Sequence, residues 1–225
     1  MAAVLRATSV NRVLAGEVPV TLVRDATLEV APGEFLAITG PSGSGKSSLL
    51  YLLGLLDRPT SGTVALEGVD TSNFDEDQLA DARLRRLGFV FQAHFLLPEF
   101  TAVENVMLPM RRLGKLSDGE IQARAERLLE SLGLSAQRDK LPSQMSGGQC
   151  QRVAVARALA NEPAIILADE PTGNLDTASS ATVQGILHDV ARNRGRTVIV
   201  VTHDQEFARS ADRKIVVVDG RIQAG

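Results

Sequence analysis

The fold of this chain is decided by the stretch Phe35-Leu36-Ala37-Ile38-Thr39-Gly40-Pro41-Ser42-Gly43-Ser44-Gly45-Lys46-Ser47-Ser48. Its first five residues predict a buried β-strand, and the apolar residues around and after Ser48 predict a helix. Between them, Gly40 to Ser47 fit the pattern G-x-x-x-x-G-K-[S/T], a loop whose backbone N–H groups converge on phosphate oxygens. The strand before this loop and the helix after it disfavour a chance glycine-rich turn. The stretch therefore predicts a nucleoside triphosphate site in an α/β fold.

Each part of this loop has an expected role toward a nucleotide. The residues expected to surround the phosphates, with help from the positive end of the helix dipole, are Gly40, Pro41, Ser42, Gly43, Ser44, Gly45 and Ser48. We expect Lys46 to reach the β- and γ-phosphates and Ser47 to bind Mg²⁺. Because kinases, GTPases and helicases share this loop, other residues must decide the class of protein.

The rest of the chain alternates between strand and helix patterns. Short apolar, β-branched segments predict strands at residues 35–39, 88–91, 164–168, 197–201 and 214–219, and such continuous apolar strands favour a mainly parallel sheet. The alternating segment before residue 31 predicts antiparallel β-structure, and we assign a β-subdomain to about 1–34 and 60–70. Helical spacing dominates about 95–145, which we assign as a helical subdomain. All of these parts are predicted to form a single domain over residues 1–225.

Two adjacent carboxylates, Asp169 and Glu170, follow the apolar segment 165–168. This is the carboxyl end of a predicted strand, where open α/β sheets form their ligand crevice. Phosphoryl transfer needs one acidic group near the metal and another that orients or deprotonates the attacking water. We therefore predict that Asp169 binds Mg²⁺ and Glu170 acts on water. The alternative is a solvated acidic pair.

His203 follows the predicted strand 197–201 and should emerge at the same edge of the sheet. An imidazole at that place can contact the γ-phosphate and help to hold the attacking water. A buried or surface histidine without a catalytic role is the alternative. His94 and His188 have no assigned role.

A further segment, Met145-Ser146-Gly147-Gly148-Gln149, lies between the phosphate loop and the acidic pair. With this segment the sequence resembles the ABC ATPases over almost the whole chain. The resemblance implies a Q-loop role for Gln92, which binds ATP and the metal, and a D-loop at Gly173-Asn174-Leu175-Asp176. It also implies that His203 is the switch histidine and acts in catalysis beside Glu170 and Lys46. The implied fold is an ABC-type P-loop ATPase.

The signature residues Ser146, Gly147, Gly148 and Gln149 are expected to form a second phosphate-binding surface. Ser146 can cap a helix whose first turn offers free N–H groups and a positive dipole end to an anion. In the family this surface faces the nucleotide of the opposing subunit. Because one chain carries all of these elements, the resemblance implies an ATP-dependent homodimer with two complete sites.

A narrower resemblance lies in QAHFLLP at 92–98, FTAVENVMLPM at 100–110 and ADEPTGNLD at 168–176. These segments resemble the LolD/MacB group of ABC ATPases, and within it most resemble the ATPases of lipoprotein release. Macrolide or peptide exporters and the FtsE cell-division ATPases are the alternatives. The group implies separate integral membrane permease subunits and a peripheral position on the cytoplasmic side of the bacterial inner membrane. Candidates for the permease contact, with ordinary burial as the alternative, are Phe95, Leu96, Leu97 and Phe100.

Composition restricts the partners of the protein. There are 24 basic and 27 acidic residues, a net charge of -3 that gives no sign of a nucleic-acid-binding face. We therefore consider an ABC ATPase of DNA repair or translation the less favoured class, and a metabolite kinase would leave residues 146–149 without a role. No apolar run approaches the roughly 20 residues that span a bilayer. We expect no secretion signal, and Cys150 as the single cysteine excludes an internal disulfide.

Three positions depart from the usual pattern of the family. No aromatic residue or histidine precedes Phe35, so Val13 or Leu14 is expected at the place where adenine usually stacks on an aromatic ring. Base selectivity should then be loose enough for GTP. Met145 replaces the usual leucine at little cost, and Cys150 occupies a place in the signature helix that could be exposed. Neither change is expected to abolish activity.

Overall fold

The computed structural model describes residues 3–223, and the strands within that range form two sheets. The main sheet has the order β10-β9-β3-β8-β7-β6. Its parallel strands are β3 (Phe35–Thr39), β6 (Leu87–Val90), β7 (Ile165–Asp169), β8 (Thr197–Val201) and β9 (Arg213–Val218), with β10 (Arg221–Gln223) antiparallel at the edge. The second sheet is antiparallel, with the order β2-β1-β4-β5, formed by β1 (Leu5–Leu14), β2 (Val20–Val30), β4 (Ser61–Leu66) and β5 (Val69–Asp70). The predicted α/β fold class is confirmed.

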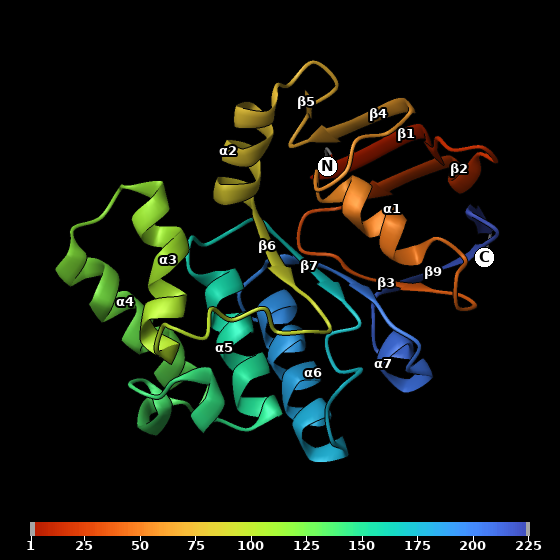
Figure 1. Ribbon diagram of the computed structural model, residues 1–225. Helices are drawn as coiled ribbons and strands as arrows, with labels where there is room; N and C mark the ends of the chain where they lie inside the picture. Colours follow the sequence, from red (N-terminus) through yellow and green to blue (C-terminus); the bar gives the residue numbers. More distant parts are fainter. Residues whose placement is uncertain (1–2, 224–225) are drawn as a thin grey trace.

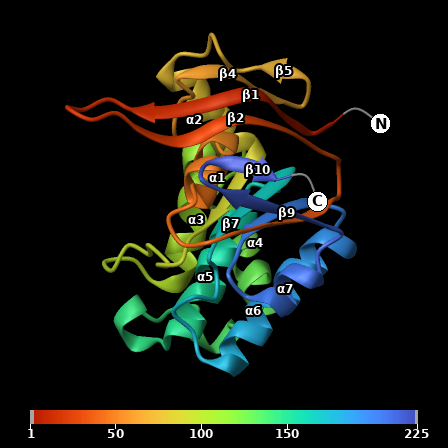
Figure 2. The same cartoon turned by 90° about the vertical axis from the view of Figure 1, so that its right-hand side faces the viewer.

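Helices lie on both faces of the main sheet. α1 (Lys46–Leu53) lies between the two sheets and contacts β1, β2, β7 and β8 (Figure 1). The opposite face is covered by α5 (Gly147–Leu159), α6 (Thr177–Arg192) and α7 (Gln205–Arg209), as the turned view makes clear (Figure 2). α3 (Ala102–Leu113) and α4 (Asp118–Ser131) pack beside α5, and α2 (Glu76–Arg86) leads from the second sheet into β6. Short 3₁₀ turns at Ser135–Gln137 and Pro142–Gln144 precede α5.

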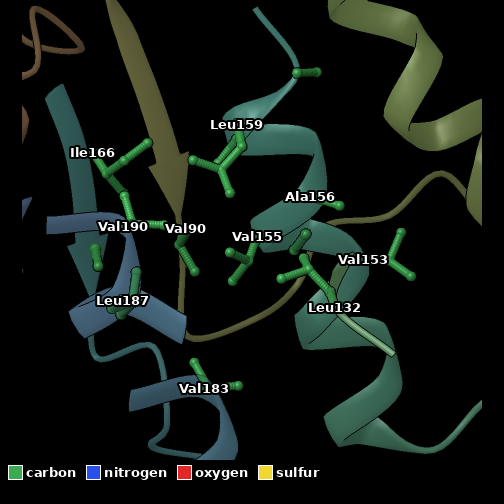
Figure 3. Close-up of a cluster of buried hydrophobic side chains, with 14 of the residues drawn as sticks. Val90, Leu132, Val153, Val155, Ala156, Leu159, Ile166, Val183, Leu187 and Val190 are labelled. Atoms are coloured by element: carbon green, nitrogen blue, oxygen red, sulfur yellow. The ribbon is translucent and has the colours of Figure 1, made fainter. Parts of the chain in front are cut away.

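Alternation along the strands divides the apolar core into two clusters. Phe35 and Ala37 face α5, α6 and α7, whereas Leu36 and Ile38 face α1 and the second sheet. This follows from the two-residue period of a strand, which sends successive side chains to opposite faces. Figure 3 shows part of the first cluster, where residues of β6 and β7 meet those of α5 and α6: Val90, Ile166, Val155, Leu159, Val183, Leu187 and Val190. Because both faces are covered, the central strands β3, β7 and β8 are mainly apolar.

The boundaries of several elements differ from the prediction. The strand expected at 88–91 covers Leu87–Val90, those at 164–168 and 214–219 are each displaced by one residue, and 35–39 and 197–201 are unchanged. The helix that opens after the phosphate loop ends at Leu53, because Gly54 packs against Phe89 and Leu167, and Leu55 adopts a positive φ of 58°. α2 was not predicted. Only its Leu79 is fully buried, so the helix carries little apolar periodicity and begins at a capping box between Asp75 and Gln78.

Among residues 3–223, no helix is both long enough and apolar enough to cross a membrane.

Candidate functional site

Three predicted segments meet at the carboxyl edge of the main sheet. The phosphate loop follows β3, Asp169 ends β7, and His203 lies two residues beyond β8. In the ladder Ile38 pairs with Val201, and Val201 pairs with Asp169. Because the three strands are parallel neighbours, their carboxyl ends share one edge, and residues distant in sequence come together there.

The phosphate loop is held against the second sheet. Gly45 has a φ of +97° and precedes the first turn of α1. A Cβ at this position would collide with the carbonyl oxygen of Leu22 in β2, so conformation and space both require glycine. The Lys46 ammonium donates hydrogen bonds to the carbonyl oxygens of Gly40 and Pro41, at 3.0 and 2.8 Å. The charge of Lys46 is therefore held over the loop, at the N-terminus of the helix.

Ser47 and Asp169 form the candidate metal site. The Ser47 hydroxyl donates to Oδ1 of Asp169 at 2.8 Å. A hydroxyl and a carboxylate are hard oxygen ligands of the kind Mg²⁺ prefers, and Mg²⁺ is commonly held by one or two carboxylates together with substrate phosphates. The residues present therefore fit a magnesium ion bound together with a nucleotide.

Gln92, the third predicted metal ligand, points toward the D-loop. Its side-chain nitrogen donates to Oδ1 of Asn174 at 3.1 Å, and Asn174 Nδ2 donates to the Gln92 carbonyl oxygen at 3.5 Å. A Cβ at Gly173 would press on the Gln92 amide. The predicted Q-loop and D-loop are thus in direct contact in this chain.

Glu170 and His203 form a pair beside the metal-site residues. Nδ1 of His203 lies 2.8 Å from Oε2 of Glu170, and the His203 backbone N–H donates to the same oxygen at 3.3 Å. The Glu170 side chain is 19% exposed and that of His203 74%. Glu170 itself has a positive φ of 46°, held by a hydrogen bond from its N–H to the Val201 carbonyl oxygen. The carboxylate is therefore oriented by two donors and remains within reach of water.

The residue after His203 anchors the following helix. Asp204 is the N-cap of α7, and its carboxylate accepts hydrogen bonds from the Glu206 and Phe207 amides. The hydrogen bond from Phe207, followed by that from the Gln184 side chain, holds the pKa of Asp204 below its usual value. His203 is thus fixed between the end of β8 and a capped helix.

The signature segment begins α5 with a capping box. Ser146 Oγ accepts from the Gln149 N–H at 3.2 Å, and Gln149 Oε1 accepts from the Ser146 N–H at 2.9 Å. The prediction that all three first-turn N–H groups are free is therefore wrong for Gln149, whose amide is used by the cap. The amides of Gly147 and Gly148 are at positions without intrahelical partners, so they remain available to an anion.

α5 packs closely against the start of α6. A Cβ at Gly148 would overlap the Ser179 side chain, and Ser179 is itself bonded to Asp176, the N-cap of α6, at 2.9 and 2.7 Å. The hydrogen bond from the Ser179 amide holds the pKa of Asp176 below its usual value. The signature and the predicted D-loop are therefore neighbours. Within residues 3–223, no hydrogen bond joins 145–149 to the phosphate loop 40–48.

Other sequence expectations concern exposure. The suggestion that Cys150 could be exposed is wrong. Its side chain is buried, its Sγ contacts the Pro142 carbonyl oxygen at 3.5 Å, and burial raises the pKa of the thiol. Val13 is half-buried and Leu14 is 42% exposed at the end of β1, both without an aromatic ring to offer.

The expected permease-contact residues differ among themselves. Phe95 and Leu97 are 63% and 42% exposed, whereas Leu96 is buried in the core and Phe100 is half-buried. Arg157 donates to the Phe95 and His94 carbonyl oxygens at 2.6 and 2.8 Å and lines a cavity of about 390 Å³ together with Phe89 and Phe91. For Leu96, the alternative of ordinary burial in the core therefore holds.

Two residues of the site were missed from the sequence. Tyr51 donates its hydroxyl to Oδ2 of Asp169 at 2.8 Å. Its place four residues after Ser47, on the same helix face, was an available signal. Gln151 is buried, and its amide donates to the carbonyl oxygens of Phe91 and Pro171 at 2.8 and 2.9 Å. It joins the end of β6 to the loop after Glu170, and no local pattern distinguishes it.

Comparison with known proteins gives the family. Residues 23–173, more than half of the chain, match the family described as ABC transporter. This chain belongs to the ABC transporter family. As the ATP-binding cassette of that family, it is an ATPase.

Similarity to individual proteins indicates which group within the ABC transporter family this chain belongs to. The chain is 52% identical over 202 residues to the lipoprotein-releasing system ATP-binding protein LolD 1 of Chlorobium chlorochromatii, covering 90% of this chain and 82% of that protein. It is 48% identical over 209 residues to the macrolide export ATP-binding/permease protein MacB of Syntrophobacter fumaroxidans, covering 92% of this chain but 29% of the relative. The ABC transporter cassette MJ0796, solved as a dimer in a post-hydrolysis state bound to ADP and Pi, superposes with a TM-score of 0.91 at 41% identity, covering 98% and 97% of the two chains. The predicted membership of the LolD/MacB group is confirmed.

Proposed function

We propose that this ATPase works as a Mg²⁺-dependent homodimer that drives separate membrane subunits in the release of lipoproteins from the inner membrane. The observation that carries the proposal is the meeting of the phosphate loop, the Ser47–Asp169 pair and the Glu170–His203 pair at one sheet edge. Loop and signature have no hydrogen bond between them within residues 3–223. A second copy would bring a signature to each loop.

The residues of one protomer divide the work of hydrolysis. The amides of residues 40–48 and the Lys46 ammonium bind the phosphates. Ser47, Asp169 and Gln92 would hold Mg²⁺, which would supply electrostatic stabilisation of the charge on the transferred phosphoryl group. Glu170 accepts a proton from the attacking water, or orients it, and His203 positions that carboxylate and contacts the γ-phosphate.

The second protomer completes each site. Its Gly147 and Gly148 amides, at the N-terminus of α5, face the γ-phosphate across the dimer. Asp176 caps α6 directly behind this signature, so the D-loop and signature reach the interface together. The dimeric state of the similar cassette MJ0796 supports this arrangement. ATP then favours the closed dimer, and hydrolysis removes the contacts that favour closure.

The relatives support the choice of cargo and partner. LolD 1 of Chlorobium chlorochromatii, at 52% identity, is named as part of a lipoprotein-releasing system. We infer that this chain binds integral membrane permease subunits through the exposed Phe95 and Leu97, on the cytoplasmic side of the inner membrane. Macrolide export is the second candidate, because the chain is also 48% identical to the cassette region of a MacB protein.

Replacement of Glu170 by Gln tests the dimer and the chemistry. The substitution keeps the size of the side chain but removes the proton acceptor, so hydrolysis should fall by about 10²- to 10⁴-fold. ATP binding should persist, and the variant should elute as a dimer with ATP and Mg²⁺ in size-exclusion chromatography. A matched variant, Glu162→Gln, alters an exposed glutamate on the opposite edge and should behave as wild type. A Glu170→Gln protein that stays monomeric under saturating ATP would contradict the proposal.

Reconstitution tests the cargo. The chain is combined in proteoliposomes with the membrane subunits of a lipoprotein-releasing system, or with a macrolide exporter from which the cassette has been removed. ATP-dependent release of lipoprotein, and stimulated ATPase activity with the first set alone, are expected. Stimulation by the exporter alone would select the second candidate.

A further inference from the structure

Both oxygens of the Asp169 carboxylate are bound by hydroxyl groups from α1. Ser47 Oγ donates to Oδ1 and the Tyr51 hydroxyl donates to Oδ2, each at 2.8 Å. The two residues are four apart, so they lie one above the other on the same face of the helix. Ser47 has an expected role toward the metal, whereas Tyr51 has none.

Tyr51 acts as a donor throughout the physiological pH range. Burial and the hydrogen bond to Asp169 raise the pKa of Tyr51 to about 12. The phenol therefore keeps its proton near neutral pH, and its hydrogen bond to a carboxylate is of the charge-assisted kind.

The ring of Tyr51 is oriented by packing that does not depend on its hydroxyl. It meets Phe91 edge-on, with ring centroids 6.4 Å apart and an interplanar angle of 67°. Phe91 in turn is stacked on Phe89, at 5.8 Å and 4°, and its carbonyl oxygen accepts from the buried Gln151 amide. Replacing Tyr51 by Phe should therefore remove one hydrogen bond and leave the ring in place.

We propose that Tyr51 is a positioning residue for the metal-binding carboxylate. A carboxylate rotates readily about its last side-chain bond, because that torsion has a broad energy profile. If Ser47 were to turn its oxygen toward a metal ion, the Tyr51 hydroxyl would still hold Oδ2 of Asp169 and leave Oδ1 free to bind. Outer groups of this kind orient ligands and strengthen metal binding. The inference rests on the proposed metal role of Asp169 and extends it to a residue on the far side of the carboxylate.

The test is the magnesium dependence of nucleotide binding in the Tyr51→Phe protein. ATP affinity is measured by isothermal titration calorimetry with excess EDTA and across a series of Mg²⁺ concentrations, in the hydrolysis-blocked Glu170→Gln background. Without Mg²⁺, both proteins should bind ATP equally well, since the hydroxyl that Tyr51→Phe removes is bonded to Asp169 and not to the phosphate loop. The Mg²⁺ concentration that gives half of the maximal increase in ATP affinity should rise about tenfold in the Tyr51→Phe protein. Tenfold is the lower end of the loss of metal affinity expected when a group that orients a metal ligand is removed.

Two further variants keep the outcome interpretable. Phe91→Leu loosens the packing of the ring but keeps the hydroxyl, so it should lower the melting temperature with a smaller change in Mg²⁺ requirement. A Tyr51→Phe protein that melts at a lower temperature yet keeps the parental Mg²⁺ requirement would overturn the proposal. The Asp169→Asn variant separates failure of the Tyr51 proposal from failure of the proposed metal site. If Asp169→Asn also keeps the Mg²⁺ requirement of the parent protein, the assignment of Asp169 to the metal is itself wrong.

Discussion

Gly148 illustrates how single residues of the site serve two purposes. It offers a first-turn amide to an anion, and its missing Cβ leaves room for Ser179 at the start of α6. In most helices, replacing glycine by alanine is stabilising, by up to about 1 kcal/mol. Here the added methyl group overlaps the Ser179 side chain, which is fixed by its hydrogen bond to Asp176. At Gly148, packing should therefore make the replacement of glycine by alanine destabilising rather than stabilising.

We predict that Gly148→Ala lowers the free energy of unfolding by about 1–3 kcal/mol, the usual range for overpacking. In a Ser179→Gly background the overlap disappears, and Gly148→Ala should then lower the free energy of unfolding by less than half as much. Urea unfolding of the two single variants and the double variant measures this coupling.

Gly185 provides the matched control. It lies in α6, it is exposed, and a Cβ there would meet nothing within 4 Å. Gly185→Ala should stabilise the protein by up to about 1 kcal/mol. Equal effects at Gly148 and Gly185 would contradict the packing argument.

At the scale of elements, α7 is a short helix that depends on its cap. The Asp204 carboxylate accepts from two amides and from Gln184, which lies on α6. The cap therefore joins two helices and holds the residue directly after His203. Loss of such a cap costs about 1 kcal/mol.

The lowered pKa of Asp204 predicts how stability changes with pH. Because the pKa of Asp204 in the folded protein lies below its usual value of 3.8, the unfolded chain binds more protons in this range. The contribution of Asp204 is present above pH 3.8 and is lost as the pH falls through the lower folded-state pKa. Asp204→Asn should accordingly reduce stability at neutral pH and flatten this acid dependence.

Urea unfolding between neutral pH and pH 3 measures both effects of Asp204→Asn. Asp25→Asn, at an exposed position with a positive φ within β2, serves as the control for loss of a negative charge. The same acid dependence in the two variants would contradict the assigned contribution of the Asp204 carboxylate to stability.

The elements differ in how well sequence foretells them. β3 and β8 are predicted to the residue because apolar, β-branched segments end at clear breaks, at Gly40 and at Thr202-His203. α2 escapes prediction because only Leu79 is fully buried, so its apolar pattern is weak. For the site, Ser47, Asp169 and Glu170 are recognisable because chemistry dictates residue type and spacing. Gln151 is not, since its partners are backbone carbonyl groups of segments far away in sequence.

The whole molecule consists of layers, with α1 between two sheets and the remaining core on the other face of the main sheet. The phosphate loop is anchored to the layer of the second sheet, whereas the signature belongs to the layer of α5 and α6. Both layers meet the catalytic edge formed by β7 and β8. The segment after Gln92 is hydrogen-bonded to Arg157 of α5. A partner that binds this segment therefore contacts the layer of α5 and α6, which carries the signature.

We predict that the exposed side chains of this segment contribute to binding of the membrane subunits. Replacing Phe95 and Leu97 together by Ser should weaken binding to the solubilised permease by about tenfold or more, because aromatic and apolar anchors supply most of the energy at interfaces. ATPase activity of the isolated cassette should be unchanged, since both side chains are exposed and lie outside the phosphate loop, the acidic pair and His203. Biolayer interferometry and ATPase assays measure the two quantities.

The control for this variant is Val69→Ser. Val69 is 54% exposed on the second sheet and is a comparable apolar side chain outside the segment after Gln92. Its replacement should leave permease binding intact. Equal weakening by Val69→Ser would show that general surface hydrophobicity, rather than this segment, determines the association.

The hydroxyl that binds Asp169 also has an optical consequence. The chain has one tyrosine and no tryptophan, so its tyrosine fluorescence comes from Tyr51 alone. A phenol bonded to a carboxylate is quenched, because the excited ring releases its proton more readily to such an acceptor. Emission from the unlabelled protein thus reports on one carboxylate in each protomer. Any event that breaks this hydrogen bond, such as a rearrangement of Asp169 when two cassettes close, should change the tyrosine emission without an added probe.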